Sequence, residues 1–272
     1  MCSNWKRGDR KSDMTLEEIE RAFSSPFWRY IENANVSGGE PTTRNDLVDI
    51  CRIMLDKLPR MRKFGLNTTG LTPHRAIPML TDIVKMCAER DIIFSFRVSI
   101  DGVGEMHNEV RQVPRGFDKA NETIRAMQAL QKDYPFNFGI STTIFGQNLD
   151  DAENILNWAR GENLDIVFNM VRFTDSMLGN SDLAESCTPV GEEEERMRQF
   201  FLDRVRIDPL LDGQNYIYMH YADMIANGYH RLAPCPFQTQ GIMLNPDGGL
   251  FFCENSEIVG NVRDTDPGEI YF

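Results

Sequence analysis

Short apolar runs alternate with amphipathic stretches along most of this chain, and this alternation constrains its fold more than any other feature. Five runs have the length and composition of strands, at about residues 34–37, 64–70, 92–100, 136–145 and 165–173. Four amphipathic helices separate them, at about 45–58, 73–90, 117–131 and 149–160. Connections of this kind join parallel strands by right-handed crossovers. The sequence therefore predicts an α/β fold with a parallel sheet, either barrel-like or open.

The segments outside this alternation carry their own signals. Thr15 and Glu18 form a capping-box pattern that predicts a helix ahead of the first strand. Two loops are expected, one containing His107 and Arg111 and one at about 174–191. Two helical stretches follow up to about residue 227. Short strands at 241–245 and 250–252 then flank Pro246-Asp247-Gly248-Gly249, which predicts a hairpin.

Charge and hydropathy exclude several classes of partner. The formal net charge is −12, which argues against binding nucleic acid through phosphate contacts. No apolar run is long enough to span a bilayer, and the first residues do not resemble a secretory signal. The sequence thus predicts a cytoplasmic protein with no nucleic-acid or membrane partner.

The cysteines divide by context. Cys51 and Cys87 lie within apolar helical stripes and are predicted to be buried core thiols, whereas Cys187 is predicted to be a surface or loop thiol. Cys235 and Cys253 flank the two strands of the predicted hairpin. Such a pair indicates a metal knuckle or a disulfide, and a reducing compartment favours the metal.

The first predicted strand runs into Gly38-Gly39-Glu40-Pro41. Two glycines let the backbone turn sharply and bring its polar groups against a ligand. Glu40 adds a carboxylate where parallel α/β folds place their sites, at the carboxyl end of a strand. A simple strand-to-helix turn explains the same residues, so this motif gains its value from others in the chain.

Four motifs together resemble the radical S-adenosylmethionine (radical SAM) enzymes, in the branch with a C-terminal SPASM or twitch extension. Gly38-Gly39-Glu40-Pro41 is similar to the family's glycine-rich motif, and Asn67-Thr68-Thr69-Gly70 to its turn after the next strand. Ser99-Ile100-Asp101-Gly102, followed by His107 and Arg111, resembles a further strand-end motif. Cys235, Gly248 and Cys253 match the opening half of a SPASM pattern.

This resemblance implies a fold and a domain division. The fold is a partial (β/α)6 TIM-like barrel lacking its first strand, with a small C-terminal β-hairpin extension. The implied domains are a radical SAM partial barrel at 1–180, a helical linker at 181–230 and a cysteine hairpin of SPASM or twitch type at 231–272.

The resemblance also implies cofactors. The family uses a [4Fe–4S] cluster to cleave SAM reductively, and the resulting 5′-deoxyadenosyl radical abstracts hydrogen from a substrate. Cys2 resembles the third cysteine of the Cys-x3-Cys-x2-Cys cluster motif, and Cys235 and Cys253 are expected to ligate a possible auxiliary [4Fe–4S] cluster. Because the first two cysteines of that motif do not precede Cys2, we expect an N-terminally truncated chain that is inactive alone. An incidental N-terminal thiol is the alternative interpretation of Cys2.

The family's SAM contacts carry over to six residues here. Gly38, Gly39 and Glu40 are expected to hold the ammonium group of SAM. Arg111 is expected to bind the SAM carboxylate, and Ser99 a ribose hydroxyl or the carboxylate, with Asp101 as a further cofactor-binding residue. Three residues of this region have ordinary alternatives: Arg111 as a solvated loop residue, Asp101 as a turn former and His107 as a structural hydrogen-bonder.

Several functions remain open on this evidence. We expect a radical SAM enzyme that modifies a peptide or protein side chain and receives electrons from a flavodoxin or ferredoxin. The same chemistry on a small metabolite or sugar is the first alternative, and a degenerate scaffold or binding protein without a cluster is the second. A barrel hydrolase is a distant fourth, because no Ser/His/acid set stands out among four histidines.

Overall fold

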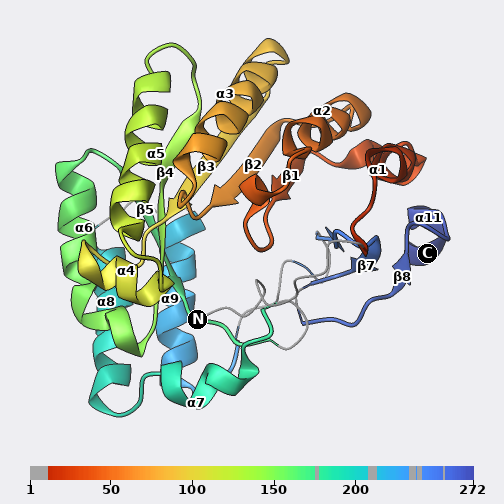
Figure 1. Cartoon of the computed structure of the whole chain (residues 1–272). Helices are drawn as coiled ribbons and strands as arrows, with labels where there is room; N and C mark the ends of the chain where they lie inside the picture. The colour runs from red at the N-terminus through yellow and green to blue at the C-terminus, as the bar shows by residue number, and fades with distance from the viewer. Residues whose placement is uncertain (1–11, 175–177, 208–212, 233–236, 238–240, 254) are drawn as a thin grey trace.

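The computed structural model describes residues 12–174, 178–207, 213–232, 237, 241–253 and 255–272. Its centre is a five-stranded sheet in which every pair is parallel and the strand order follows the chain. The strands are β1 (Asn33–Val36), β2 (Lys63–Thr68), β3 (Ile93–Ser99), β4 (Asn137–Ile144) and β5 (Asp165–Met170). The curved sheet confirms the predicted α/β fold and corresponds to a partial barrel (Figure 1).

Helices cover the outer side of this sheet (Figure 1). The crossovers contain α2 (Leu47–Lys57), α3 (Pro73–Glu89), α5 (Gly116–Leu130) and α6 (Ala152–Gly161), close to the predicted ranges. Ahead of β1, α1 (Leu16–Phe23) begins at the predicted capping box, where the Thr15 hydroxyl accepts from Glu18 N at 3.2 Å. The Thr15 amide donates in return to Glu18 Oε2 at 2.9 Å.

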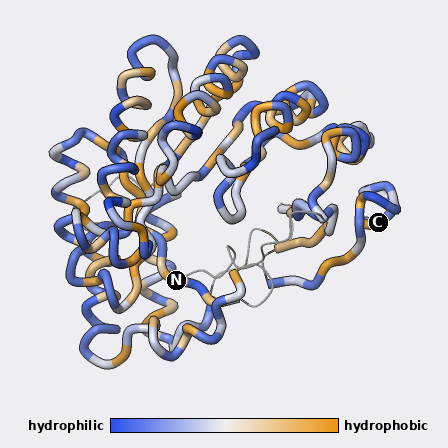
Figure 2. The backbone as a smooth tube through the Cα atoms, in the orientation of Figure 1, coloured by the Kyte–Doolittle hydropathy of each residue, from blue (hydrophilic) through white to orange (hydrophobic). Residues whose placement is uncertain are grey.

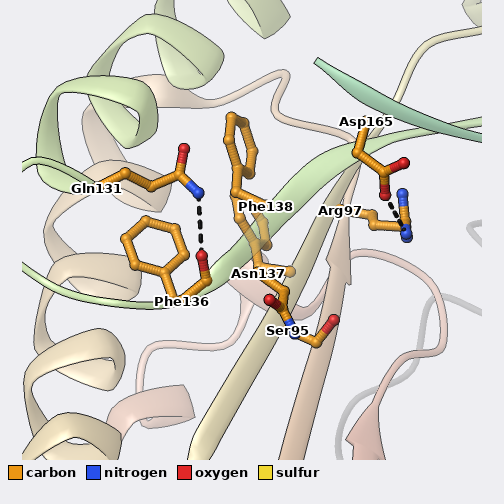
Figure 3. Close-up of a pocket in the computed structure, with 8 residues that line it drawn as sticks. Ser95, Arg97, Gln131, Phe136, Asn137, Phe138 and Asp165 are labelled. Carbon is orange, nitrogen blue, oxygen red and sulfur yellow. Dashed lines mark hydrogen bonds and ion pairs between the residues drawn. The ribbon is translucent and has the colours of Figure 1, made fainter. Parts of the chain in front are cut away.

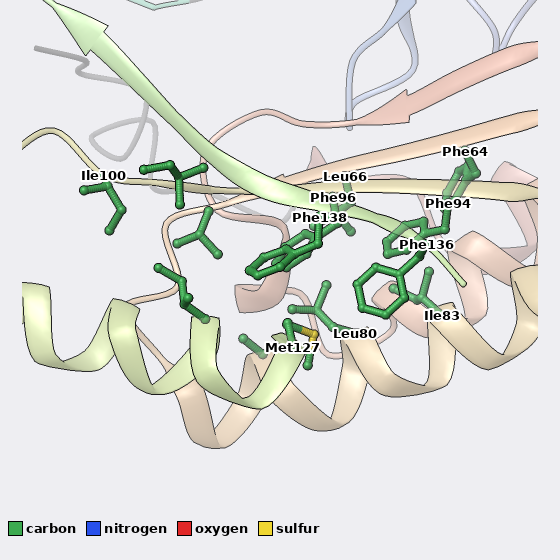
Figure 4. Close-up of a cluster of buried hydrophobic side chains, with 14 of the residues drawn as sticks. Phe64, Leu66, Leu80, Ile83, Phe94, Phe96, Ile100, Met127, Phe136 and Phe138 are labelled. Atoms are coloured by element: carbon green, nitrogen blue, oxygen red, sulfur yellow. The ribbon is translucent and has the colours of Figure 1, made fainter. Parts of the chain in front are cut away.

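The hydrophobic core lies between the outer face of the sheet and these helices. Alternate strand residues point outward and are fully or almost fully buried, among them Phe64, Phe94, Phe96 and Ile140. Figure 4 shows Phe64, Phe94 and Phe96 packed against Leu80 of α3 and other helix side chains. Cys51 and Cys87 are buried in the same core, as predicted.

Two further helices pack against the last strand, α8 (Glu192–Ile207) and α9 (Gly213–Ala226). Phe200 of α8 meets Phe168 of β5 edge-to-face, with ring centroids 4.9 Å apart. From α9, the Tyr218 hydroxyl accepts a hydrogen bond from Phe168 N at 3.0 Å, so a side chain satisfies one amide of this edge strand. The helices share the core of the sheet; the domain boundaries near 180 and 230 stay predictions.

The C-terminal segment forms a separate antiparallel sheet, β6 (Met243–Leu244), β7 (Gly249–Phe251) and β8 (Gly260–Asn261), followed by α11 (Pro267–Tyr271). The predicted hairpin is confirmed, while its third strand and the final helix were not predicted. This sheet docks beside α1 (Figure 1), where the Arg263 guanidinium pairs with both carboxylate oxygens of Glu18 at 3.0 and 3.1 Å. Met14 N also donates to Pro246 O at 2.7 Å.

Other short elements also differ from the prediction. The predicted loop around His107 contains a helix, α4 (Glu105–Arg111). The polar stretch after β5 contains a 3-10 turn, η6 (Ser181–Leu183), and α7 (Ala184–Cys187). Helix α3 begins at Pro73, where a proline suits the first helical turn, and continues through Pro78 to Glu89.

Hydropathy along the backbone is mixed, with apolar and polar residues interleaved in most helices (Figure 2). Among the described residues, no helix combines the length and the apolar character needed to cross a membrane.

Candidate functional site

The inner face of the parallel sheet is polar. Parallel sheets in α/β proteins are ordinarily apolar on both faces. Here the inward positions are exposed or half-buried and mostly hydrophilic: Asn35, Asn67, Ser95, Arg97, Ser99, Ser141, Thr143 and Asn169. A polar and accessible face on a parallel sheet indicates a binding surface, with its functional groups expected at the carboxyl ends of the strands.

The turn after β1 presents backbone to open space. Gly38 has φ +127°, a conformation that favours glycine. A Cβ placed on Gly38 or Gly39 would meet no atom within 4 Å. The backbone of both residues is therefore accessible to a ligand at the carboxyl edge of the sheet.

The Glu40 carboxylate anchors this turn to the neighbouring strand. Its Oε1 accepts from Thr42 N at 3.0 Å and from the hydroxyls of Thr42 and Thr68, each at 2.7 Å. Its Oε2 accepts from Thr69 N at 2.6 Å and the Thr69 hydroxyl at 2.5 Å. The protein thus occupies the acceptor positions of this carboxylate. In the structure Glu40 joins the ends of β1 and β2, and its predicted ammonium contact stays a prediction.

A buried ion pair lies at the end of β3. The Asp101 carboxylate is 1% exposed, and its Oδ2 lies 2.5 Å from Nη2 of Arg111 on α4. The Arg111 side chain is 21% exposed. The structure thus brings these two predicted residues into direct contact, with Arg111 on a short helix rather than in a solvated loop.

Ser99 is the last residue of β3 and pairs in register with Ser141 of β4. The Ser99 side chain has no hydrogen-bond partner among the described residues. Glu40 thus follows the carboxyl end of β1, and Ser99 and the Asp101–Arg111 pair lie at the carboxyl end of β3, with β2 between them.

His107 locks the backbone beside the ion pair. It is fully buried, and its Nδ1 accepts a hydrogen bond from Asp101 N at 3.1 Å. Burial, and then the nearby positive charge of Arg111, lower the pKa of His107 to about 4, while Asp101 opposes this shift. The imidazole is therefore neutral near pH 7, and His107 acts as a structural hydrogen-bond acceptor, the alternative that the sequence left open.

This geometry predicts a pH dependence of stability. An unfolded histidine titrates near its ordinary pKa of 6.5, whereas folded His107 titrates at about 4. The unfolded state therefore binds more protons between these values, and stability falls as pH drops from 6.5 towards 4. Integrated over that window, the shift corresponds to about 3 kcal/mol. We expect His107→Gln, which retains an acceptor for Asp101 N, to lose this component in urea denaturation at a series of pH values. If the stability of the wild type and of the variant changed equally with pH, this component would not belong to His107.

The predicted metal ligands divide by location. Cys2 and Cys235 lie outside the described residues. Cys253 is half-buried with a free thiol, and its turn is closed by Ser256, whose hydroxyl accepts from Cys253 N at 3.2 Å. Within the described part of the chain, no group of three or more His, Cys, Asp or Glu side chains forms a metal site. The ligand roles of all three cysteines stay predictions.

A hollow of about 410 Å³ lies at the opposite end of the sheet, where β4 and β5 begin. Figure 3 shows Phe136 and Gln131 on one side of it and the Arg97–Asp165 pair on the other, with a separation of 2.7 Å between Arg97 Nη2 and Asp165 Oδ2. It is remote from the Gly38 turn along the strands, so we place the candidate site at the carboxyl edge on the basis of chemistry rather than cavity size.

The prediction did not include the groups that hold these residues in place. Thr42, Thr68 and Thr69 fix Glu40, and Thr143 N donates to Asp101 Oδ1 at 2.9 Å. One signal was present, because the run Phe94-Ser95-Phe96-Arg97-Val98-Ser99 alternates strictly between apolar and polar residues. That period of two predicts a strand with one polar face.

The sequence model of the Radical SAM superfamily matches residues 1–159 of this chain. The chain belongs to the Radical SAM superfamily. Members of this family use a [4Fe–4S] cluster together with SAM. The matched region contains the Gly38 turn and the Asp101–Arg111 pair, so the superfamily assignment and the site geometry concern the same part of the molecule.

Curated relatives of this radical SAM chain act on different substrates. It is 32% identical over 127 residues to the AdoMet-dependent heme synthase of Methanosarcina barkeri, covering 46% of this chain and 32% of that protein. It is 26% identical over 152 residues to the GTP 3′,8-cyclase of Rhodopseudomonas palustris, covering 54% and 40% respectively. The chain thus spans less than half the length of these relatives.

Solved structures share the fold of this radical SAM chain. Native anSMEcpe with bound AdoMet and Kp18Cys peptide aligns with a TM-score of 0.60 at 17% identity, over 95% of this chain and 72% of that one. The complex of the same protein with the Cp18Cys peptide gives a TM-score of 0.61 at 17% identity, with the same coverage. At this level of identity the likeness shows the fold alone.

The residues at the strand ends fit the amino-acid part of SAM. Gly38 and Gly39 offer accessible backbone oxygen and nitrogen atoms, and Arg111 offers a guanidinium fixed at one end by Asp101. An ammonium requires acceptors and a carboxylate requires a cation, and this edge of the sheet contains both.

Proposed function

We propose that this chain is a radical SAM enzyme that modifies a peptide or protein side chain. The polar, accessible inner face of the parallel sheet supports this function best, because the Gly38 turn and the Asp101–Arg111 pair lie at its carboxyl edge. When bound, the [4Fe–4S] cluster and SAM supply a 5′-deoxyadenosyl radical that abstracts a hydrogen atom from the substrate.

The chain's own residues bind and orient SAM and hold the clusters. The backbone of Gly38 and Gly39 accepts the ammonium of SAM, while Glu40 holds that turn in place. Arg111 binds the carboxylate of SAM, and the Ser99 hydroxyl binds a ribose hydroxyl or the same carboxylate. Cys2 is a ligand of the SAM-binding cluster, and Cys235 and Cys253 are ligands of an auxiliary cluster.

The peptide assignment draws on the peptide complexes of anSMEcpe and on the inner face itself. Asn35, Asn67 and Asn169 have no side-chain hydrogen bonds within the described residues, and amides match the donors and acceptors of a peptide backbone. A small metabolite is the second candidate, favoured by the heme synthase and cyclase relatives.

The test measures 5′-deoxyadenosine release from protein reconstituted anaerobically with iron and sulfide, supplied with SAM and reduced by dithionite, flavodoxin or ferredoxin. In protein whose iron content shows that the [4Fe–4S] cluster has assembled, we expect cysteine-containing peptides to increase release over the substrate-free rate, with a mass change in the peptide. Stimulation by tetrapyrroles or nucleotides alone would favour the metabolite. If SAM neither binds nor is cleaved, the proposed function is wrong.

A further inference from the structure

Asp101 has an unusually complete set of partners within the protein. Its Oδ1 accepts from Thr143 N at 2.9 Å, and its Oδ2 pairs with Arg111. Its main-chain N donates to His107 Nδ1 at 3.1 Å, and its main-chain O accepts from Asn148 Nδ2 at 3.0 Å. Three polar groups of this residue are thus hydrogen-bonded to β4, α4 and the segment after β4, whereas the buried Oδ2 has the ion pair with Arg111 and no hydrogen bond among the described residues.

A buried carboxylate carries a large desolvation cost unless a cation compensates it. The Asp101 side chain is 1% exposed, and among the described residues Arg111 is the cation that pairs with it. A ligand carboxylate beside Arg111 would be repelled by Asp101 if both approached the same atoms. Asp101 is thus poorly suited to contact the amino-acid end of SAM directly, and well suited to fix the guanidinium that does.

We infer that Asp101 is a positioning residue that acts through Arg111 and does not touch SAM. This inference rests on the proposed function, because it assumes that Arg111 binds the SAM carboxylate. The Asp101 contact uses one end of the guanidinium, at Nη2. An arginine has five N–H donors in a rigid planar fork, so fixing one end also sets the direction of the rest.

The buried contact between the end of β3 and β4 includes other residues besides the Asp101–Arg111 ion pair, and one of them supplies a control. Next to Asp101, the Thr142 hydroxyl donates to Ile100 O at 2.6 Å, and it is fully buried. Thr142→Val perturbs the same junction of β3 and β4 without removing the charge that faces Arg111. A structural effect of Asp101 should resemble this variant, whereas a positioning effect should not.

The experiment compares two probes that differ in the group Arg111 would bind. S-adenosylhomocysteine has the amino-acid carboxylate, and 5′-methylthioadenosine lacks it. Binding is measured by equilibrium dialysis on the reconstituted protein. We expect Asp101→Asn to weaken S-adenosylhomocysteine binding by about tenfold or more, the loss of a well-placed charge contact, and to change 5′-methylthioadenosine binding by less than about twofold. Thr142→Val should change both affinities by the same small factor.

A double-mutant cycle covers the case in which Asp101→Asn folds poorly. In Asp101→Asn/Arg111→Gln both charges are absent, so no buried charge is left unpaired. If Asp101 acts through Arg111, this variant binds S-adenosylhomocysteine no more weakly than Arg111→Gln alone. Equal losses for both probes in Asp101→Asn, or additive losses in the cycle, would overturn the inference. Wild-type protein that binds neither probe would instead overturn the proposed function.

Discussion

Gly139→Ala is expected to destabilise the protein by about 3 kcal/mol, at the upper end of the usual cost of overpacking. Gly139 lies on the inner face of β4, in register with Asp165 of β5. A Cβ at this position would lie 2.4 Å from the main-chain oxygen of Asp165 and 3.0 Å from Nη1 of Arg97. Because a backbone atom of the adjacent strand cannot move independently, the two strands must separate. Urea denaturation of both proteins measures the loss.

Gly65→Ala is the matched control for this prediction. Gly65 is also on the inner face, and its Cβ would lie equally close to another atom, 2.4 Å from Oδ1 of Asn35. That atom is the end of an exposed side chain that can rotate away. We therefore expect Gly65→Ala to lower the free energy of unfolding by less than about 1 kcal/mol. Adding Asn35→Ala in the same chain removes the clashing atom and should make this loss smaller still. Similar losses for Gly139→Ala and Gly65→Ala would contradict the role given to the Asp165 backbone.

The sheet and its helices were predictable because their signals are local and periodic. Apolar runs, helical stripes and the Thr15–Glu18 capping box each lie within a short window of sequence. Because each helix must bury its apolar face, the helices form a layer against the sheet. The helix α4 has no such signal: its seven residues contain few apolar positions, and it begins after Gly104, which has φ +61°. It is held by tertiary contacts of His107 and Arg111, which no local pattern contains.

The candidate site was predictable as motifs but not as geometry. Resemblance placed Glu40 and Asp101 at strand ends, and the structure agrees with that placement, whereas Arg111 was expected in a loop and lies on α4. The partners were not predictable, because they join positions far apart in sequence, such as Glu40 with Thr68 and Thr69. Local propensity contains no information about such pairings, so the sequence did not predict the protein donors that these two carboxylates have in the structure, and their predicted ligand contacts stay predictions.

Glu40→Ala is expected to be about as destabilising as the Gly139 substitution, at about 3 kcal/mol. It removes the acceptor for two backbone amides, of Thr42 and Thr69, and for three threonine hydroxyls. Hydrogen bonds to a charged group contribute about 1.5–3 kcal/mol each, but five bonds that share one carboxylate do not add. Thr42 and Thr68 are buried, so their hydroxyls and the two backbone amides lose a partner that water does not readily replace. Urea denaturation measures the loss.

Glu40→Gln separates anchoring from ligand binding. Glutamine keeps the shape of the side chain, but its amide NH₂ faces donors where the carboxylate accepted. If Glu40 mainly anchors the Gly38-Gly39 turn, the unliganded Glu40→Gln variant is less stable than the unliganded wild type. Because the turn is then less ordered, the variant binds both S-adenosylhomocysteine and 5′-methylthioadenosine more weakly. If Glu40 mainly binds the ammonium, the unliganded variant is as stable as wild type and only the amino-acid-bearing ligand binds more weakly. The five contacts from Thr42, Thr68 and Thr69 favour the first result, since a carboxylate with its acceptor positions occupied would have to give up a protein donor to reach a ligand.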